Sequence, residues 1–421
     1  MPLVLFTWAR FEVNLALIVS PLAFLCFFRT PGSVRNLFVI TGAAGLTSIA
    51  LASLTLGDQF SVRYLLSLAL VLTSPLYFFL GSYLCSRHWD FDDALSVLAM
   101  VSAVFVTIIT IQVIVTGEQV RWYVGEAGYT VLNVTLIGLP LYGSFGALSL
   151  ASLLLLHLFV IGAVFATAQR RLEQVVLVAG FGAAVFLVTG SNARSAQLVL
   201  PYLLILLGLG ALKGSRQVRV RAGVLLAVGL LAFSYSSSRM VEELRIVSTV
   251  TEVMGLPPTT TVSRPGHGPR AGRRRVEDME KLSSGRKSLL EDALQEVALS
   301  PIFGTGFASY NRIDPSVGQR SRLSGNRTTH VHYLTILWKG GVLFFLPYMV
   351  LVGAFWSEAL RGARARITAG VAFLFAGLVF LFVVVSLTWD ILLVPSAGAY
   401  AFFLLGALGH SGRRDVADRR P

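Results

Sequence analysis

The chain has 421 residues, of which 55% are hydrophobic and only 14% are charged, and its mean hydropathy is +0.71. This composition excludes a soluble globular domain and indicates an integral membrane protein. The net charge of +13 does not indicate nucleic-acid binding, because the basic residues are divided among many short loops.

Apolar stretches that are long enough to cross a bilayer recur along the chain, since a helical span needs about 20 mostly apolar residues. Several contain Gly or Pro, which membrane helices tolerate better than soluble helices do. We expect eleven such helices, at residues 11–28, 37–56, 64–84, 94–116, 146–168, 174–190, 196–212, 222–238, 331–356, 367–388 and 391–409. The predicted fold class is therefore all-α, a polytopic transmembrane helical bundle of about eleven or twelve spans.

Lysine and arginine residues are concentrated in the loops on one side of this predicted bundle. That side carries Arg29, Arg35, Arg87, Arg170, Arg171, Lys213, Arg216, Arg219, Arg221, Arg361, Arg364, Arg366, Arg413, Arg414, Arg419 and Arg420. The other short loops carry only Arg10, Arg63, Arg121 and Arg194. Because basic residues of short loops favour the cytoplasm, we expect a cytoplasmic C-terminus in the cytoplasmic (inner) membrane and, with an odd number of spans, an N-terminus outside.

A long polar segment interrupts the hydrophobic pattern in the C-terminal half of the chain. It predicts three parts: an N-terminal transmembrane bundle (1–238), a large periplasmic or extracytoplasmic loop (239–330), and C-terminal transmembrane helices with a cytoplasmic tail (331–421). The loop is basic, but long loops are largely exempt from the charge rule that orients short ones. The loop therefore does not contradict the predicted topology.

The stretch 283–301 of this loop, SSGRKSLLEDALQEVALSP, repeats its apolar residues at helical spacing. It predicts an amphipathic helix that ends at Pro301 and lies on the outer membrane face or on the bundle. Gly304 and Gly306 follow this helix and permit a tight turn.

Two arginines lie where an anion could bind. Arg194 is in SNARSA (191–196), between two apolar spans, and a cation at membrane depth is costly enough to mark a functional candidate. Arg286 begins the amphipathic helix, whose N-terminus favours anions, and its planar guanidinium suits phosphate. The alternatives are an arginine that reaches from a tight turn to the lipid head groups, and a solvated arginine in a basic loop.

His330 and His332 lie at the start of the ninth predicted span, in TTHVHYLTILWKGG (328–341). In a helix that begins at residue 331, positions two apart point to opposite sides, so His330 shares a face with Tyr333 whereas His332 does not. The pair is therefore a poor metal chelate, no Cys, Asp or Glu nearby adds a third ligand, and we expect no metal site. The alternative is that both histidines are polar residues at the membrane interface.

Arg194, Arg286 and His330 all fall on the predicted outer face, and a base with two phosphate-binding arginines suggests a lipid-linked pyrophosphate substrate. Their motifs also resemble those of the bacterial O-antigen ligase and O-antigen polymerase superfamily. Members of that superfamily have an Arg-containing turn between two spans, an Arg-started helix that leads into P-x-x-G-x-G, and a His-Asn-x-Tyr/Phe-Leu motif before a Gly pair. This chain has SNARSA, SGRKSLLEDALQEVALSPIFGTGF and HVHYLTILWKGG over residues 186–345, with Val331 in place of the usual Asn.

This resemblance implies a metal-independent, inverting glycosyltransferase of the GT-C type that needs no cofactor. The donor would be undecaprenyl-pyrophosphate-linked glycan, and the acceptor a glycan or glycolipid such as lipid A-core. Carried over by position, His330 would be the catalytic general base, and Arg194 and Arg286 would bind the pyrophosphate. Further candidates for substrate contact are Asn192, Arg327, Tyr333, Gly304 and Gly306.

Other functions stay open at this point. An O-antigen or exopolysaccharide polymerase would need the same base and the same arginines as a ligase, and would differ only in its acceptor. A transporter of an anion or of a lipid-linked sugar belongs to another class, but transporters usually show paired halves with broken helices, and we find no such halves. The acidic stretch WDFDD (89–93) is a rival site, but it lies on the predicted cytoplasmic side.

Overall fold

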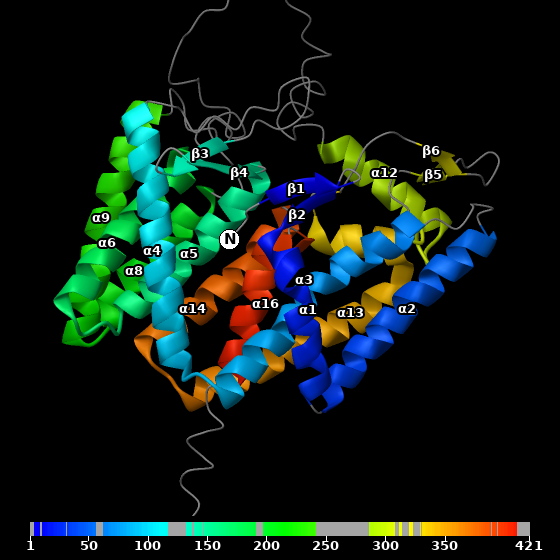
Figure 1. The fold of residues 1–421 in the computed structure, drawn as a ribbon, viewed down its shortest axis with the longest axis horizontal. Coiled ribbons are helices and arrows are strands. Elements are labelled where there is room, and N and C mark those ends of the chain that lie inside the picture. The colour runs from blue at the N-terminus through cyan, green and yellow to red at the C-terminus, as the bar shows by residue number, and fades with distance from the viewer. Residues whose placement is uncertain are drawn as a thin grey trace, which may run out of the picture.

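The computed structural model describes residues 4–8, 11–30, 32–55, 62–116, 132–136, 139–145, 147–190, 197–240, 286–307, 311–313, 320–322, 329, 331–388, 390–393 and 395–410. These residues form a bundle of helices with three short antiparallel hairpins at one of its ends (Figure 1). The helices are α1 (Leu15–Arg29), α2 (Ser33–Thr55), α3 (Val62–Arg87), α4 (Phe91–Thr116), α5 (Ala147–Phe165), α6 (Arg171–Gly190), α8 (Val199–Lys213), α9 (Arg216–Met240), α12 (Arg286–Leu299), α13 (His332–Ala365), α14 (Ala369–Val379), the π-helix η1 (Phe380–Val385), α15 (Ser386–Thr388), the 3₁₀-helix η2 (Ile391–Leu393) and α16 (Pro395–His410).

Seven of the described helices are long and apolar enough to cross a membrane, and four shorter apolar helices accompany them. The seven are Ser33–Thr55, Tyr64–Arg87, Phe91–Ile111, Arg171–Gly190, Arg216–Ser237, His332–Ala365 and Ala369–Thr388. The four are Ile18–Arg29, Leu154–Phe165, Val199–Lys213 and Ala397–His410. Each of these segments overlaps one of the eleven predicted spans, so the predicted polytopic all-α bundle is confirmed.

The hairpins were not predicted. They pair β1 (Val4–Trp8) with β2 (Phe11–Asn14), β3 (Leu132–Leu136) with β4 (Leu139–Phe145), and β5 (Asn311–Ile313) with β6 (Arg320–Arg322). Their strands are only 3 to 7 residues long. A strand is recognised in a sequence by alternating apolar and polar residues, and strands this short in an apolar sequence show too few alternations to be recognised.

Helix α16 lies in the middle of the bundle, where it packs most extensively against α3 and also packs against α13. A Cβ atom at Gly406 would meet the backbone of Phe78, so only glycine lets α16 approach α3 this closely. The Phe78 ring also stacks on Phe355 of α13, with 4.0 Å between the ring centroids. Membrane helices are commonly held together by close packing of their backbones. The hydrophobic effect contributes little to their association, because lipid tails are as apolar as the side chains.

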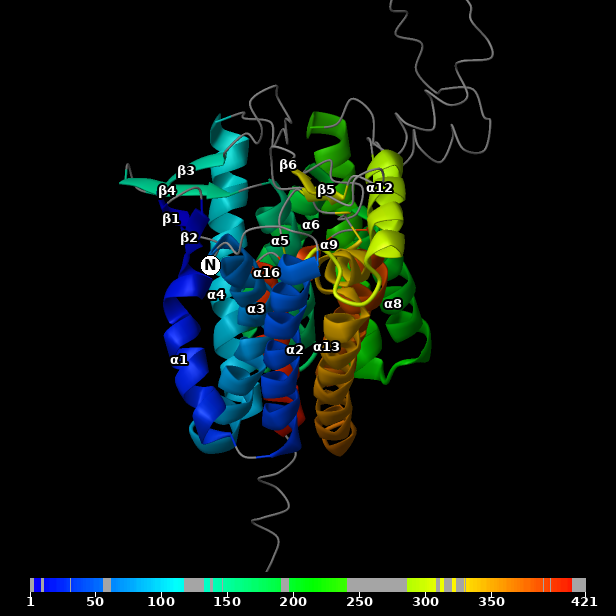
Figure 2. The same cartoon turned by 90° about the vertical axis from the view of Figure 1, so that its right-hand side faces the viewer.

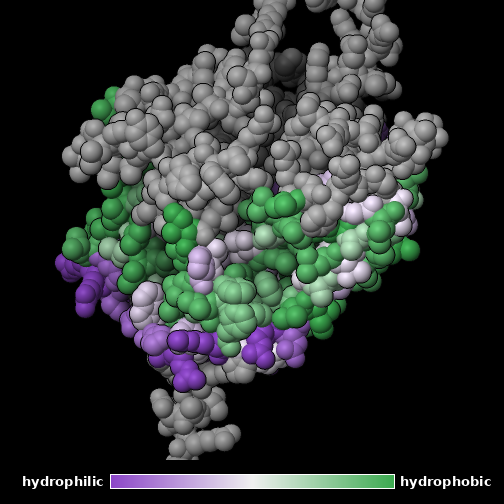
Figure 3. All heavy atoms as spheres, turned by 45° about the vertical axis from the view of Figure 1, so that its right-hand side comes forward, coloured by the Kyte–Doolittle hydropathy of each residue, from purple (hydrophilic) through white to green (hydrophobic). Residues whose placement is uncertain are grey.

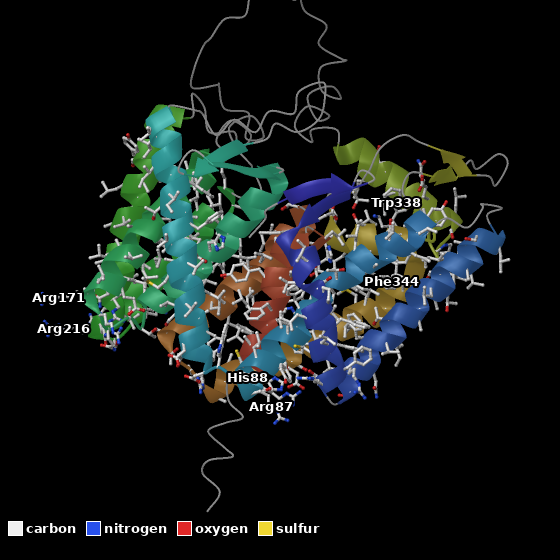
Figure 4. The ribbon with its side chains drawn as sticks, viewed as in Figure 1. Arg87, His88, Arg171, Arg216, Trp338 and Phe344 are labelled. Atoms are coloured by element: carbon white, nitrogen blue, oxygen red, sulfur yellow. The ribbon has the colours of Figure 1, made fainter. Side chains whose placement is uncertain are left out.

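The two ends of the bundle differ in charge. Figure 3 shows hydrophilic residues, in purple, along the lower rim and hydrophobic residues, in green, above them. The connections α1–α2, α3–α4, α5–α6, α8–α9 and α13–α14 all meet at this rim, which we call the basic end; Arg87, His88, Arg171 and Arg216 mark it in Figure 4. The basic loops of the sequence therefore do share one end of the molecule, and the compartment that this end faces stays a prediction.

The acidic stretch 89–93 also lies at the basic end. Arg366, which follows α13, binds Asp90 at 3.1 Å and Asp92 at 3.6 Å. Helix α12 and the hairpin β5–β6 lie at the opposite end (Figure 2). The rival acidic site is thus separated from the start of α13 by the length of the bundle.

Helix α9 ends at Met240 and α13 begins at His332. Between them the structure describes α12, residues 300–307, the two strands of the last hairpin, and residues 329 and 331. The proposed division of the chain at residues 239 and 331 is compatible with these bounds and stays a prediction.

Candidate functional site

Residues 301–307 form a turn that packs into a break in α13. Gly304 and Gly306 have φ angles of 59° and 63°, in the left-handed region that glycine adopts readily. In α13, Gly341 has a φ of 61° and a ψ of −173°, which interrupts the helix and kinks it. The break leaves backbone groups of α13 without partners in their own helix, and the turn supplies those partners.

Four backbone hydrogen bonds join the turn to the break. They run from Thr305 N to Trp338 O (3.0 Å), from Phe307 N to Lys339 O (2.9 Å), from Val342 N to Pro301 O (2.9 Å) and from Leu343 N to Ile302 O (2.9 Å). The carbonyl of Gly340 accepts a further bond from Ser48 Oγ of α2, at 2.8 Å. The P-x-x-G-x-G motif and the glycine pair, which are far apart in sequence, therefore form one structural unit.

Helix α12 is fixed to the same part of α13. The indole Nε1 of Trp338, a residue labelled in Figure 4, donates to Glu296 Oε2 at 2.5 Å, and Glu296 is buried. Just beyond the turn's second glycine, Phe307 packs edge-on against Phe344, with 4.9 Å between the ring centroids. Of the two predicted locations for the amphipathic helix, the structure thus gives the one on the bundle.

The chain on both sides of position 330 is held in place by hydrogen bonds. The hydroxyls of Thr329 and Thr335 are 2.7 Å apart, and the Val331 N–H donates to Thr329 Oγ1 at 3.2 Å. Val331 has an extended conformation and α13 begins directly after it. His330 itself lies outside the described residues, and the hydrogen bonds on either side of it are those of Thr329 and Val331.

His332 is fully buried, and its Nε2 atom lies 3.1 Å from the hydroxyl oxygen of Tyr348. The alternative that both histidines are interfacial polar residues therefore does not fit His332, which is a packed residue of the helix. In the described part of the chain, no three His, Cys, Asp or Glu side chains gather closely enough to hold a metal ion.

Two buried ionisable residues lie beside this unit. Lys339 lies in α13 and is only 8% exposed. Asp390 lies between α15 and η2 and is only 5% exposed. Neither carboxylate oxygen of Asp390 has a hydrogen-bond partner among the described residues, and we expect its charge to act on Lys339 and His332, which lie near it. Because a buried charge is costly without an opposite one, we infer that Asp390 compensates Lys339.

Sequence reasoning did not identify this acid. A signal was present, since Asp390 is the one acidic residue in the apolar C-terminal stretch 367–410. An acid isolated among apolar spans marks a position where burial of a charge must be compensated.

This compensation can be measured with a double-mutant cycle. Asp390→Asn and Lys339→Met should each lower the free energy of unfolding by about 3 kcal/mol, because each leaves an uncompensated buried charge. The double variant should lose at least about 1 kcal/mol less than the sum of the two single losses. The measurement is unfolding of the purified protein by SDS in mixed micelles. Strictly additive losses would show that the two charges do not interact.

The comparisons with known proteins address the same region. Residues 177–349 match the O-antigen ligase family model. The match begins within α6, ends within α13 and covers less than half of the chain, and it confirms the resemblance to the O-antigen ligase and polymerase superfamily. Among curated proteins and among solved structures, none matches. An O-antigen ligase-like membrane function follows, with glycan or lipid-linked substrates.

Every predicted site residue of this ligase-like chain lies within the matched range. The structure describes three of them completely: Gly304 and Gly306 are in the turn, and Tyr333 is in the first turn of α13. The Tyr333 hydroxyl donates to the carbonyl of Phe382 in η1, at 2.6 Å, so it ties the start of α13 to the π-helix. Arg286 is the first residue of α12, but its side chain is not among those described. The remaining candidates, Asn192, Arg194, Arg327 and His330, lie outside the described residues.

Proposed function

We propose that this chain is a membrane glycosyltransferase of the GT-C type. It transfers undecaprenyl-pyrophosphate-linked glycan onto an acceptor hydroxyl, on a glycan or a glycolipid such as lipid A-core, at the outer face of the cytoplasmic membrane. The observation that supports this most is the unit formed by the turn 301–307 and the broken helix α13. It joins two of the motifs on which the family resemblance rests, and His330 lies two residues before α13.

The proposed reaction is a single displacement. The acceptor oxygen attacks the anomeric carbon of the donor sugar from the side opposite the pyrophosphate, and the bond from that carbon to the pyrophosphate oxygen breaks. The configuration at the carbon inverts. His330 accepts the proton of the acceptor hydroxyl, a role that suits an imidazole because it titrates near neutral pH. Undecaprenyl pyrophosphate leaves with the bonding electrons.

Arg194 and Arg286 are proposed to hold the pyrophosphate. A guanidinium stays charged at every relevant pH and binds phosphate oxygens through two parallel hydrogen bonds. Fixed donors of this kind stabilise the charge that develops on the leaving group, and no metal ion is required for that.

The surroundings of α13 would give His330 the fixed position that catalysis needs. The flanking residues Thr329 and Val331 are hydrogen-bonded, the turn 301–307 binds α13 at residues 338–343, and α12 is attached through Glu296. A catalytic group on a rigid element is held close to the geometry that the reaction needs. The same unit would set the position of α12 and thereby of Arg286 at its start.

A transfer assay tests this proposal. Membranes of a strain that lacks its own enzyme would receive the wild type, Arg194→Ala or Arg286→Ala at equal expression, and the products would be resolved as a glycan ladder. Each variant should transfer about 10² to 10³ times more slowly, because a group that stabilises the leaving charge is lost. Arg87→Ala, at the exposed basic end, is the matched control and should transfer at the wild-type rate.

The ladder also separates the alternatives. If the chain is a ligase, the wild type should move complete glycan chains onto the acceptor. If it is a polymerase, the chains themselves should fail to lengthen in the variants, so that no ladder forms. Wild-type rates in both arginine variants would contradict the proposed pyrophosphate site. Accumulation of the substrate in vesicles without any glycan transfer would favour a transporter.

A further inference from the structure

An apolar pocket opens between α5, α8, α9 and α14 at the basic end of the bundle. Its volume is about 250 Å³ and its walls include Gly162, Phe165, Leu206, Leu225 and Phe373. Arg221 alone is charged among the described residues that line it. The pocket lies at the other end of the bundle from the proposed catalytic site, so the glycan transfer does not account for it.

Arg221 of α9 lines this pocket and is hydrogen-bonded to the chain that follows α5. Its guanidinium donates to the carbonyl of Ala166 and, at 2.6 Å, to the carbonyl of Ala168, directly after α5. These bonds satisfy carbonyls that a helix end leaves without partners, and they place a positive charge where the apolar wall meets the basic end.

Five exposed cations lie at the ends of the helices that meet in the connections α5–α6 and α8–α9, beside the residues that line the pocket. They are Arg170, before α6, Arg171 at its start, Lys213 at the end of α8, and Arg216 and Arg219 in the first turn of α9. Within the described part of the chain, none of the five has an acidic partner within 4 Å. By contrast, Arg361 and Arg366 at the same end are both paired with acids.

The helices behind these cations add to the positive potential. Helices α6 and α9 pack against each other, and they begin at Arg171 and Arg216, which lie close together at the lower left of Figure 4. Glu173 is the one acidic residue in the first turns of these two helices. The N-termini of two neighbouring helices, with Arg171 and Arg216 close together at their starts, therefore lie at this end of the bundle, where a phosphate would be favoured.

We propose that the pocket is a binding site for an anionic glycerophospholipid of the surrounding membrane. One acyl chain occupies the apolar pocket, and the cations beside it hold the phosphate. In a membrane the pocket alone would give no preference, because a lipid tail is as well accommodated among other tails as among apolar side chains. Selectivity must therefore come from the head group, and the cations favour an anionic one.

Native mass spectrometry of the full chain tests this proposal. The purified protein would be mixed with phosphatidylglycerol or with phosphatidylcholine of the same acyl chains. The wild type should retain phosphatidylglycerol about tenfold more than phosphatidylcholine, since several cations near a membrane surface each favour an anionic lipid. The variant Arg170→Gln/Arg171→Gln/Arg216→Gln/Arg219→Gln should show nearly equal retention of the two lipids.

Two further variants distinguish a site from a general surface charge. Arg35→Gln/Arg87→Gln/Arg361→Gln/Arg364→Gln removes as many cations from the same end but none beside the pocket, and it should keep the wild-type preference. Ala372→Trp fills the pocket from a lining position, leaves every cation in place, and should reduce the retained phosphatidylglycerol severalfold. An unchanged preference in the pocket-side variant, an equal loss in the control variant, or full retention in Ala372→Trp would each overturn the proposal.

Discussion

The His330→Ala variant is expected to insert and fold like the wild type but to transfer glycan about 10² to 10⁴ times more slowly, which is the usual contribution of a general base. Its fold should survive because the hydrogen bonds on either side of position 330 join Thr329, Val331 and Thr335, and none of these bonds involves an imidazole. The measurement is the initial rate of glycan transfer in membranes at equal expression.

A base can also be recognised by its pH dependence and by chemical rescue. The wild-type rate should rise with pH as the histidine loses its proton, whereas the residual rate of His330→Ala should lack that rise. Added imidazole should restore part of the variant's rate. His88→Ala is the matched control, because His88 is an exposed histidine at the basic end. Equal transfer by the wild type and by His330→Ala would remove the base from the mechanism.

Replacement of Gly341 by alanine is expected to have the largest effect on the fold near the site. The φ and ψ angles of Gly341, 61° and −173°, lie in a region that is open almost only to glycine. A Cβ atom there would also meet the carbonyl of Ile302 and lie 2.5 Å from the backbone nitrogen of Gly304. We expect a loss of about 3 kcal/mol or more in the free energy of unfolding, as backbone strain and steric overlap add.

Gly353→Ala is the matched control in the same helix. Gly353 is exposed and has no neighbour within 4 Å of a Cβ atom, so the change should be neutral or stabilise by up to about 1 kcal/mol. SDS-induced unfolding of the two purified variants makes the comparison. Equal stability of Gly341→Ala and Gly353→Ala would show that the turn 301–307 does not depend on the break in α13.

The glycine variant also tests how the fold supports the proposed chemistry. If the turn no longer docks on α13, the four backbone bonds between them are lost, and α12 keeps its link through Trp338 and Glu296. The rate of glycan transfer by the folded fraction of the Gly341→Ala protein should then fall as well, because this unit is proposed to position His330 and Arg286. A folded Gly341→Ala protein with full activity would separate the fold of the unit from its role in the site.

Much of the site's character could be predicted from the sequence because its motifs are local. Gly304 and Gly306 permit a turn, Pro301 ends a helix, and a run of apolar residues after His330 predicts a span, whatever lies beside them. The order of these motifs was enough to indicate the O-antigen ligase superfamily, and the match over residues 177–349 confirmed that resemblance. The roles of His330, Arg194 and Arg286 stay proposals.

The sequence by itself determined that this chain is a bundle of membrane helices, because a helix in lipid must satisfy its backbone hydrogen bonds within its own segment, and the length and hydropathy of that segment decide the outcome. Only the tertiary structure decided which distant residues meet. It placed the turn against the broken helix, Asp390 near Lys339, and Arg221 on the carbonyls that follow α5. Such contacts depend on which helix ends lie together, and no local pattern of residues carries that information.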